Sequence, residues 1–166
     1  MERITIGDIF LGDFPISQYF GQNPELYKRW NLKGHNGVDF ALPSNTPLIA
    51  GVDGKIAEVN FDPNGFGNYI KIFDEKQKAA FLFAHLNVVL TKPGKYVSKF
   101  EIIGLSGSTG YSTAPHLHYG IYQIDEKGNR LNADNGYNGY IDPLNPKIIQ
   151  WIIRDPQGIY ANHFLR

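Results

Sequence analysis

Polar and apolar residues alternate along several short stretches of the chain, which is the pattern of a strand with one buried face. The alternation is clear in residues 55–59 and 69–73, and residues 79–86 form a more continuously apolar strand. Glycine, proline, asparagine and aspartate separate these stretches, as expected for tight turns. Shorter strands are predicted at residues 14–21, 46–50, 96–97, 101–105 and 116–124. The pattern predicts one domain that is mainly antiparallel β.

Two segments carry helix signals near the ends of the chain. Each follows an Asn-Pro pair, in which a capping residue precedes a proline of the first turn. Residues 24–30 are predicted to form one or two helical turns, although a surface loop would suit them equally. Residues 147–153 have the stronger signal and are predicted to be helical. Their apolar stripe consists of Ile148, Ile149, Trp151 and Ile152.

Composition narrows the functional classes. The 166 residues suffice for one well-packed domain, and the formal net charge is zero, so we expect neither nucleic acid nor an acidic membrane as partner. No stretch approaches the length of a membrane span, and residues 1–8 lack the apolar core of a signal peptide. There is no cysteine, so any metal must be held by histidine, aspartate or glutamate.

Two pairs of residues are suited to binding a metal. His116 and His118 are separated by one residue, so their imidazoles point to the same side of an extended chain. His35 and Asp39 also share a side if extended, and the glycines around them disfavour a helix. A His/Asp pair is most often a structural hydrogen bond, but it is also a good pair of zinc ligands.

Two further histidines complete the set of five. His85 lies near the end of an apolar strand, where alternation places it on the face of Phe81 and Phe83 and opposite Leu86. A lone histidine in that position is usually a satisfied core residue. His163 lies in the C-terminal tail and is predicted to be a surface residue.

Together with Asp39, the histidines supply enough side chains for a catalytic zinc site, which needs three protein ligands and one open position. His35, Asp39 and one member of the pair His116 and His118 would supply two nitrogens and one oxygen. The other member and His85 would remain as general base and transition-state stabiliser. The pattern favours metal-assisted hydrolysis if these residues converge in the fold.

Three motifs then resemble the signatures of the lysostaphin/LytM-type zinc metalloendopeptidases, in the family's usual order. They are His-Asn-Gly-Val-Asp at 35–39, Phe-Ala-His-Leu at 83–86 and His-Leu-His at 116–118. The segments between them are also similar, and the resemblance runs from about residue 14 to residue 146. It implies a mainly β fold of small antiparallel sheets, with a duplicated hybrid motif, zinc in a groove walled by loops and short helical turns near both termini.

The resemblance also implies roles for individual residues. His35, Asp39 and His118 would bind one zinc ion. His85 and His116 would flank the metal-bound water, one as general base and the other as stabiliser of the oxyanion. The resemblance does not indicate which residue has which role. The family's substrates imply a zinc-dependent metalloendopeptidase that hydrolyses stem or cross-bridge peptides of bacterial peptidoglycan.

The implied organisation is one metallopeptidase domain over residues 1–166, with a core at about 14–146 and a C-terminal helix and tail at 147–166. We expect a monomer whose partners are peptidoglycan peptides. Its place would be the extracellular or periplasmic cell wall, or a phage lysin or virion. No signal peptide is present in this chain, so delivery would rely on a removed signal or another route.

Some positions depart from the family pattern. A tyrosine that the family carries before the first motif has no certain counterpart, because Tyr27 and Trp30 are only nearby. The loop at 125–140 is longer than usual, so Tyr137 and Tyr140 could shape the groove. Substrate preference is therefore not transferred with the resemblance.

Three rival interpretations deserve comparison. A non-catalytic LytM-like module that regulates another wall hydrolase would typically have lost metal ligands, whereas every one is present here. A phosphohistidine carrier would have no use for Asp39. A structural metal site would close its fourth position with protein, leaving two spare histidines unexplained.

Overall fold

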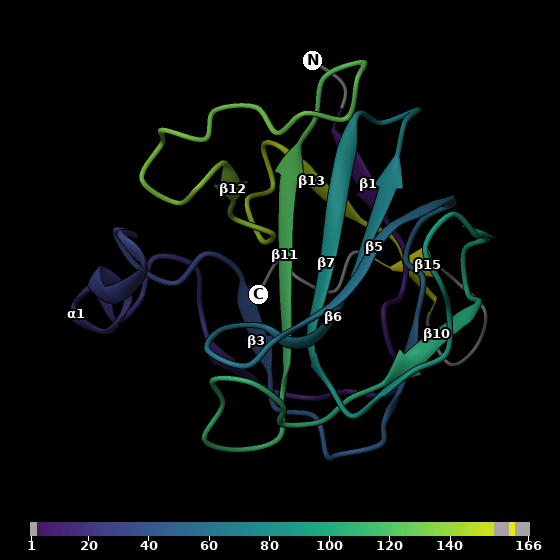
Figure 1. Ribbon diagram of the computed structural model, residues 1–166. Helices are drawn as coiled ribbons and strands as arrows, with labels where there is room; N and C mark the ends of the chain where they lie inside the picture. Colours follow the sequence, from purple (N-terminus) through teal and green to yellow (C-terminus); the bar gives the residue numbers. More distant parts are fainter. Residues whose placement is uncertain (1–2, 155–159, 162–166) are drawn as a thin grey trace.

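The computed structural model describes residues 3–154 and 160–161 (Figure 1). Short strands dominate it, and one helical segment lies near the N-terminus. The elements in chain order are β1 (Ile4–Ile6), β2 (Ile16–Gln18), α1 (Pro24–Tyr27), the 3₁₀ turn η1 (Lys28–Trp30), β3 (Val38–Phe40), β4 (Pro47–Ile49), β5 (Gly54–Asp62), β6 (Gly67–Asp74), β7 (Ala79–Leu86), β8 (Val88–Val89), β9 (Tyr96–Val97), β10 (Ile102–Leu105), β11 (Leu117–Gln123), β12 (Tyr140–Ile141), β13 (Ile149–Trp151), β14 (Ile153–Arg154) and β15 (Tyr160–Ala161).

The largest sheet has the strand order β2-β3-β11-β7-β6-β5-β9, and β12 pairs with β11 (Figure 1). Every pairing in this sheet is antiparallel, as the sequence predicts. β7 coincides with the predicted apolar strand at 79–86 and is buried along its whole length. The central strands β7 and β11 are therefore the rigid part of the sheet, and the site is built on them.

The two faces of this sheet are covered by two different hydrophobic clusters. Alternation along β11 places Leu117, Tyr119 and Ile121 in the larger core cluster, together with apolar residues of β1, β4, β10 and β13. The opposite face carries a smaller cluster that includes Leu82, Ala84, Tyr122 and Tyr140. His118 has the same parity as Tyr122, so it lies on the face with the thinner covering.

The C-terminal helix predicted at 147–153 is not formed. A turn leads into β13, which pairs in parallel with β1 so that Ile4 lies opposite Ile149 and Ile6 lies opposite Trp151. Both β13 residues are buried in the larger core, which a strand achieves by alternation. Tertiary pairing thus overrides the local helix signal. Beyond β13, β14 pairs with β15, and residues 155–159 and 162–166 of the predicted tail, including His163, lie outside the described residues.

The N-terminal helical prediction is confirmed, because α1 and η1 occupy residues 24–30. Asn23 precedes them in a left-handed conformation with φ of 54°, and its side chain makes no capping bond. Asn31, with φ of 57°, ends η1. Within the described part of the chain, no helix is long and apolar enough to cross a membrane.

Candidate metal centre

Three side chains converge on one point at the β3 end of the main sheet. The Nε2 atom of His35 lies 2.9 Å from Nδ1 of His118 and 3.1 Å from Oδ1 of Asp39. Nδ1 of His118 lies 3.0 Å from the same carboxylate oxygen. Asp39 and His118 are direct partners in the antiparallel pair β3–β11, so the sheet register itself brings them together.

The donor set fits a zinc ion. His35 is fully buried, and its Nδ1 donates a hydrogen bond to the carbonyl oxygen of Tyr19 at 3.1 Å. The proton is therefore on Nδ1, and Nε2 offers a lone pair to the point of convergence. Two ligands of a tetrahedral zinc ion lie roughly 3.3 Å apart. The triangle of two nitrogens and one oxygen needs to open only slightly to hold the ion.

The electrostatics match these ligand roles. Burial alone would raise the pKa of the Asp39 carboxyl, but the adjacent imidazoles of His118 and His35 outweigh burial and hold that pKa well below its ordinary value. Burial lowers the pKa of His118. At neutral pH Asp39 is anionic and His118 is neutral, which are the states a metal requires.

Gly37 makes room for the ring of His118. A Cβ atom at residue 37 would lie 2.6 Å from Cε1 and 2.8 Å from Nε2 of that ring, and 2.6 Å from the carbonyl oxygen of Tyr119. These are distances that real Cβ atoms do not adopt. The glycine between His35 and Asp39 is therefore required by the packing of the third member of the triangle.

His85 and His116 lie beside the triangle and face each other, with ring centroids 4.5 Å apart. Nδ1 of His85 donates to the carbonyl oxygen of Thr109 at 2.7 Å, and Nδ1 of His116 donates to that of Ala114 at 2.8 Å. Because a carbonyl only accepts, both rings carry their proton on Nδ1. Each Nε2 is left as an acceptor, and that of His116 lies 3.7 Å from Oδ2 of Asp39.

The prediction that His85 shares a face with Phe81 and Phe83 is wrong. His85 has a left-handed backbone with φ of 64°, which interrupts the alternation of β7. Leu86 then joins the larger core with Phe81 and Phe83, while the ring of His85 turns toward His118, at a centroid distance of 6.0 Å. The strained conformation is what places this histidine in the site.

Burial, together with the neighbouring His118 and His116, lowers the pKa of His85 to about 3. The ring is therefore neutral at physiological pH, and its Nε2 keeps a free lone pair. A histidine at the end of an apolar strand is here not a satisfied core residue, because its Nε2 remains available beside the triangle.

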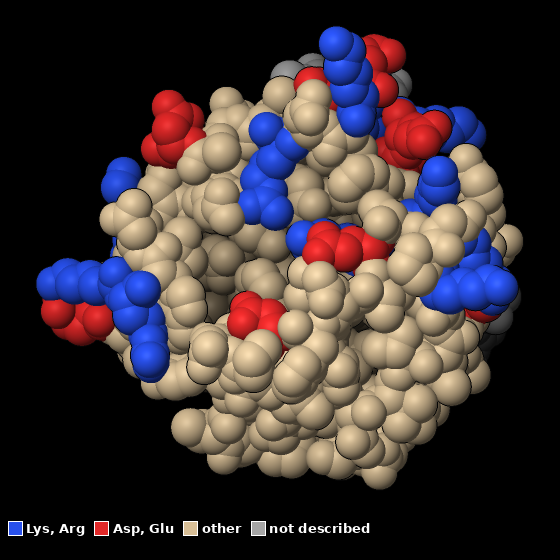
Figure 2. All heavy atoms as spheres, viewed as in Figure 1, with Lys and Arg blue, Asp and Glu red and all other residues tan. Residues whose placement is uncertain are grey.

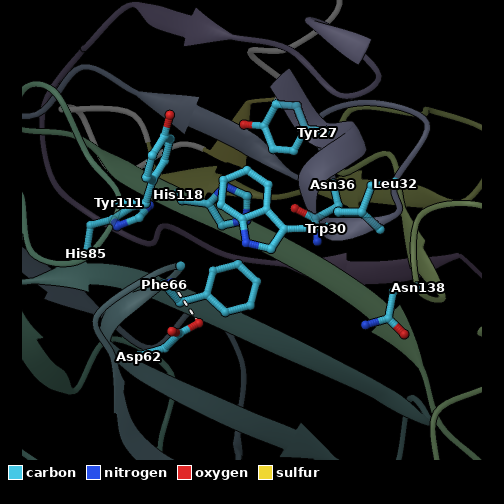
Figure 3. Close-up of a pocket in the computed structure, with 11 residues that line it drawn as sticks. Tyr27, Trp30, Leu32, Asn36, Asp62, Phe66, His85, Tyr111, His118 and Asn138 are labelled. Atoms are coloured by element: carbon cyan, nitrogen blue, oxygen red, sulfur yellow. Dashed lines mark hydrogen bonds between the residues drawn. The ribbon is translucent and has the colours of Figure 1, made fainter. Parts of the chain in front are cut away.

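A cavity of about 240 Å³ opens next to these side chains (Figure 3). Its lining comes from α1 and η1, from the turn between β5 and β6, and from the loops before β3, β11 and β12. The lining residues include both candidates for the missing family tyrosine, Tyr27 and Trp30. The ring of Tyr27 lies 5.4 Å from that of His35. Burial, with the Asp39 carboxylate as the next cause, raises the pKa of the Tyr27 hydroxyl.

The long loop at 125–140 contributes differently from the prediction. Asn138 lines the cavity, whereas Tyr140 is almost completely buried and Tyr137 packs on Phe20 at a centroid distance of 4.5 Å. Neither tyrosine is among the residues that line the cavity.

Two of the residues that line the cavity, Trp30 of η1 and Tyr111 of the loop before β11, contact each other. The rings of Trp30 and Tyr111 are 5.1 Å apart, and the guanidinium of Arg29 lies over both, at 5.0 and 4.6 Å from their centroids. Figure 2 shows the hollow on this face, with an uncharged floor and both acidic and basic side chains around it.

Sequence comparison places the three motifs within a known family. The model of peptidase family M23 matches residues 33–133. Lysostaphin from Staphylococcus simulans is 45% identical over 85 residues, which are 51% of this chain and 17% of lysostaphin. The peptidoglycan DD-endopeptidase ShyA of Vibrio cholerae is 38% identical over 99 residues, which are 60% of this chain and 22% of that protein. The chain spans less than a third of the length of these curated relatives.

Solved structures have the same fold. The catalytic domain of lysostaphin from Staphylococcus simulans superposes with a TM-score of 0.65 at 32% identity, covering 79% of this chain and 90% of that domain. A catalytic domain of the prophage-encoded M23 protein EnpA from Enterococcus faecalis gives a TM-score of 0.60 at 28% identity, covering 76% and 93% respectively. The mainly β, lysostaphin-like fold expected from the sequence is confirmed.

Proposed function

The chain belongs to peptidase family M23, and from this we propose that it is a zinc-dependent metalloendopeptidase acting on the peptides of bacterial peptidoglycan. The observation that carries the proposal is the convergence of His35, Asp39 and His118 within about 3 Å of one another, beside two histidines with a free Nε2. A purely structural metal site would have no need of the second pair.

In this proposal Nε2 of His35, Oδ1 of Asp39 and Nδ1 of His118 hold one zinc ion. The bound ion supplies Lewis-acid chemistry, which polarises the scissile carbonyl and activates water. The three ligands leave the side toward the cavity open. The anionic Asp39 offsets part of the ion's charge.

His85 and His116 supply the proton transfers. Water adds across the C–N bond, so one proton must leave the attacking water and one must reach the departing amine. A neutral imidazole with a free Nε2 accepts the first proton, and its protonated form donates the second. The other imidazole would first take up a proton from solvent at Nε2 and then donate a hydrogen bond to the developing oxyanion. Hydrogen bonds from Nδ1 to backbone carbonyls orient both rings and leave Nε2 of each ring free for these proton transfers.

The substrate class is inferred from the relatives. ShyA of Vibrio cholerae is a peptidoglycan DD-endopeptidase, and a further relative, ALE-1 of Staphylococcus capitis, is a glycyl-glycine endopeptidase, which points to wall peptides as the substrates of this chain. The protein would then act at the cell wall, outside the cytoplasm. A module that only regulates another wall hydrolase is the alternative, and the complete ligand set argues against it.

Digestion of purified peptidoglycan tests the proposal. Muropeptides released by the zinc-loaded protein are identified by mass spectrometry, with and without a chelator. We expect new amine and carboxyl ends that disappear on chelation and return when zinc is restored. The variant His116→Ala serves as a control for contaminating hydrolases. Binding to the wall without any new chain end would favour the regulatory module instead.

A further inference from the structure

Asp62 is the one acidic side chain among the described residues that line the cavity (Figure 3). It lies at the end of β5, and its side chain is half-buried. The sequence places it at the start of an Asp-Pro-Asn-Gly turn, which explains why it is not identifiable as a site residue from the pattern alone.

Hydrogen bonds within the turn use only part of the capacity of the Asp62 carboxylate to accept hydrogen bonds. Oδ1 accepts a hydrogen bond from the amide of Asn64 at 3.1 Å, and Oδ2 accepts one from the amide of Phe66 at 3.4 Å. A carboxylate has about four acceptor positions, so each oxygen of Asp62 retains one. The second bond is also long, which leaves Oδ2 weakly satisfied.

Asp62 differs from four of the glutamates elsewhere in the chain. Glu25, Glu58, Glu101 and Glu126 each form an ion pair with a lysine. In the described part of the chain, no lysine, arginine or histidine forms an ion pair with Asp62. A carboxylate facing a cavity without a cation of its own is a recognition element for a cation brought by a ligand.

Aromatic rings complete the surroundings of this carboxylate. Phe66, Trp30, Tyr27 and Tyr111 line the same cavity. In Figure 3 the rings of Phe66 and Trp30 lie between Asp62 and Tyr27. Aromatic faces attract ammonium groups and bind them better when water is displaced. The guanidinium of Arg29 lies over Trp30 and Tyr111, at 5.0 and 4.6 Å from their centroids, so rings that line this cavity already contact one cation.

We propose that Asp62 determines specificity by binding a protonated primary amine of the substrate peptide close to the scissile bond. This inference rests on the proposed peptidase function and narrows its substrate class. The amine can be the side-chain amino group of a diamino acid or the free N-terminus of a short peptide. Both present the same ammonium chemistry.

Three synthetic peptides built around the bond that muropeptide analysis identifies separate these sources. One carries only the side-chain amine, one only the free N-terminus, and one has every amine acetylated. Each is assayed with the zinc-loaded unmodified protein and with Asp62→Asn, which keeps the shape of the turn residue but removes its charge. Asp13→Asn, a change of the same kind at an exposed acid that does not line the cavity, is the matched control.

We expect Asp62→Asn to lower kcat/KM about ten-fold on the peptide whose amine is recognised, mainly through KM. The acetylated peptide should change less than about two-fold, because it makes no charge-assisted bond. Asp13→Asn should resemble the unmodified protein on all three. The peptide that responds to Asp62→Asn identifies the source of the amine.

Equal losses on amine-bearing and acetylated peptides would overturn the inference and assign Asp62 to the turn alone. No loss on any peptide would also overturn it, while leaving the peptidase function intact. If the unmodified protein cleaves none of the three peptides and releases no chain ends from peptidoglycan, the proposed function fails and the inference fails with it. Thermal melting of Asp62→Asn distinguishes lost recognition from lost folding.

Discussion

The main chain of Thr109 forms a hydrogen bond with His85, and the side chain of Thr109 forms one with Leu86, the next residue of β7. The carbonyl oxygen of Thr109 accepts the 2.7 Å hydrogen bond from Nδ1 of His85, and its hydroxyl donates to the carbonyl oxygen of Leu86 at 2.8 Å. The same hydroxyl accepts from the amide of Asn68 at 3.0 Å. Gly67 permits this contact, because a Cβ there would lie 2.4 Å from Thr109.

Replacing Thr109 with valine should therefore disturb His85 without touching it. Loss of both hydroxyl bonds should cost about 1–3 kcal/mol of stability and reduce kcat, while zinc content stays near one per chain. Thr109→Ser, which keeps the hydroxyl, should restore most of the activity. Metal analysis, melting curves and peptide kinetics provide the readouts. A serine variant as slow as the valine variant would show that the hydroxyl is not what positions His85.

Asp39→Ala should abolish zinc binding and activity together. The change removes the one anionic ligand and leaves His35 and His118 buried without their shared partner. Leaving buried polar groups unsatisfied should also destabilise the fold by about 1–3 kcal/mol. Zinc per chain is measured by atomic emission after gel filtration, with Asp13→Ala as the control. Stoichiometric zinc in Asp39→Ala would remove this residue from the ligand set.

His85→Ala should retain zinc but slow hydrolysis by about 10²–10⁴-fold, which is the usual contribution of a general acid or base. His85 makes none of the three contacts of the triangle, so the ligands should be undisturbed. His116→Ala gives the matching comparison, and the double variant tests whether the two rings act as one unit. Unmodified kinetics in His85→Ala would contradict its catalytic role.

Gly37→Ala should disturb the metal centre, although residue 37 is not itself a candidate metal ligand. The added Cβ would press on the ring of His118 and on the carbonyl oxygen of Tyr119, neither of which is a flexible side-chain end. We expect a stability loss of about 1–3 kcal/mol and weaker zinc binding. Gly7→Ala is the control, because a Cβ there would lie 3.2 Å from the stem of Lys99 and 3.3 Å from the carbonyl oxygen of Gly51, contacts that are longer than those at Gly37 and do not involve a candidate metal ligand. Zinc titration of both variants should separate them, and equal affinities would contradict the packing argument.

The sequence sufficed for the parts of the site that depend on local pattern. The spacing of His35 and Asp39 and that of His116 and His118 indicate side chains that share a face, and the register of β3 and β11 does bring Asp39 beside His118. The apolar run at 79–86 predicts β7 without error in its bounds. The places of Asp39 and His118 follow from strand pairing and the period of two, whereas His35 and His116 lie just before β3 and β11.

Other parts depend on contacts that no local pattern encodes. Alternation along β7 misplaces His85, because one left-handed residue reverses the faces beyond it. The stripe at 147–153 fits a helix as well as a strand, and only pairing with β1, far away in the chain, decides between them. Asp62 is indistinguishable from any turn aspartate until the fold places it in the cavity.

Asp39 and His118 are cross-strand neighbours within the largest sheet, whereas most of the cavity wall is carried by turns and loops. The candidate metal centre and the cavity wall, which would select the substrate, are therefore separable parts of one molecule. Under the proposed function, exchange of the wall segments between members of the family should change the substrate that is cleaved while the three candidate metal ligands stay unchanged.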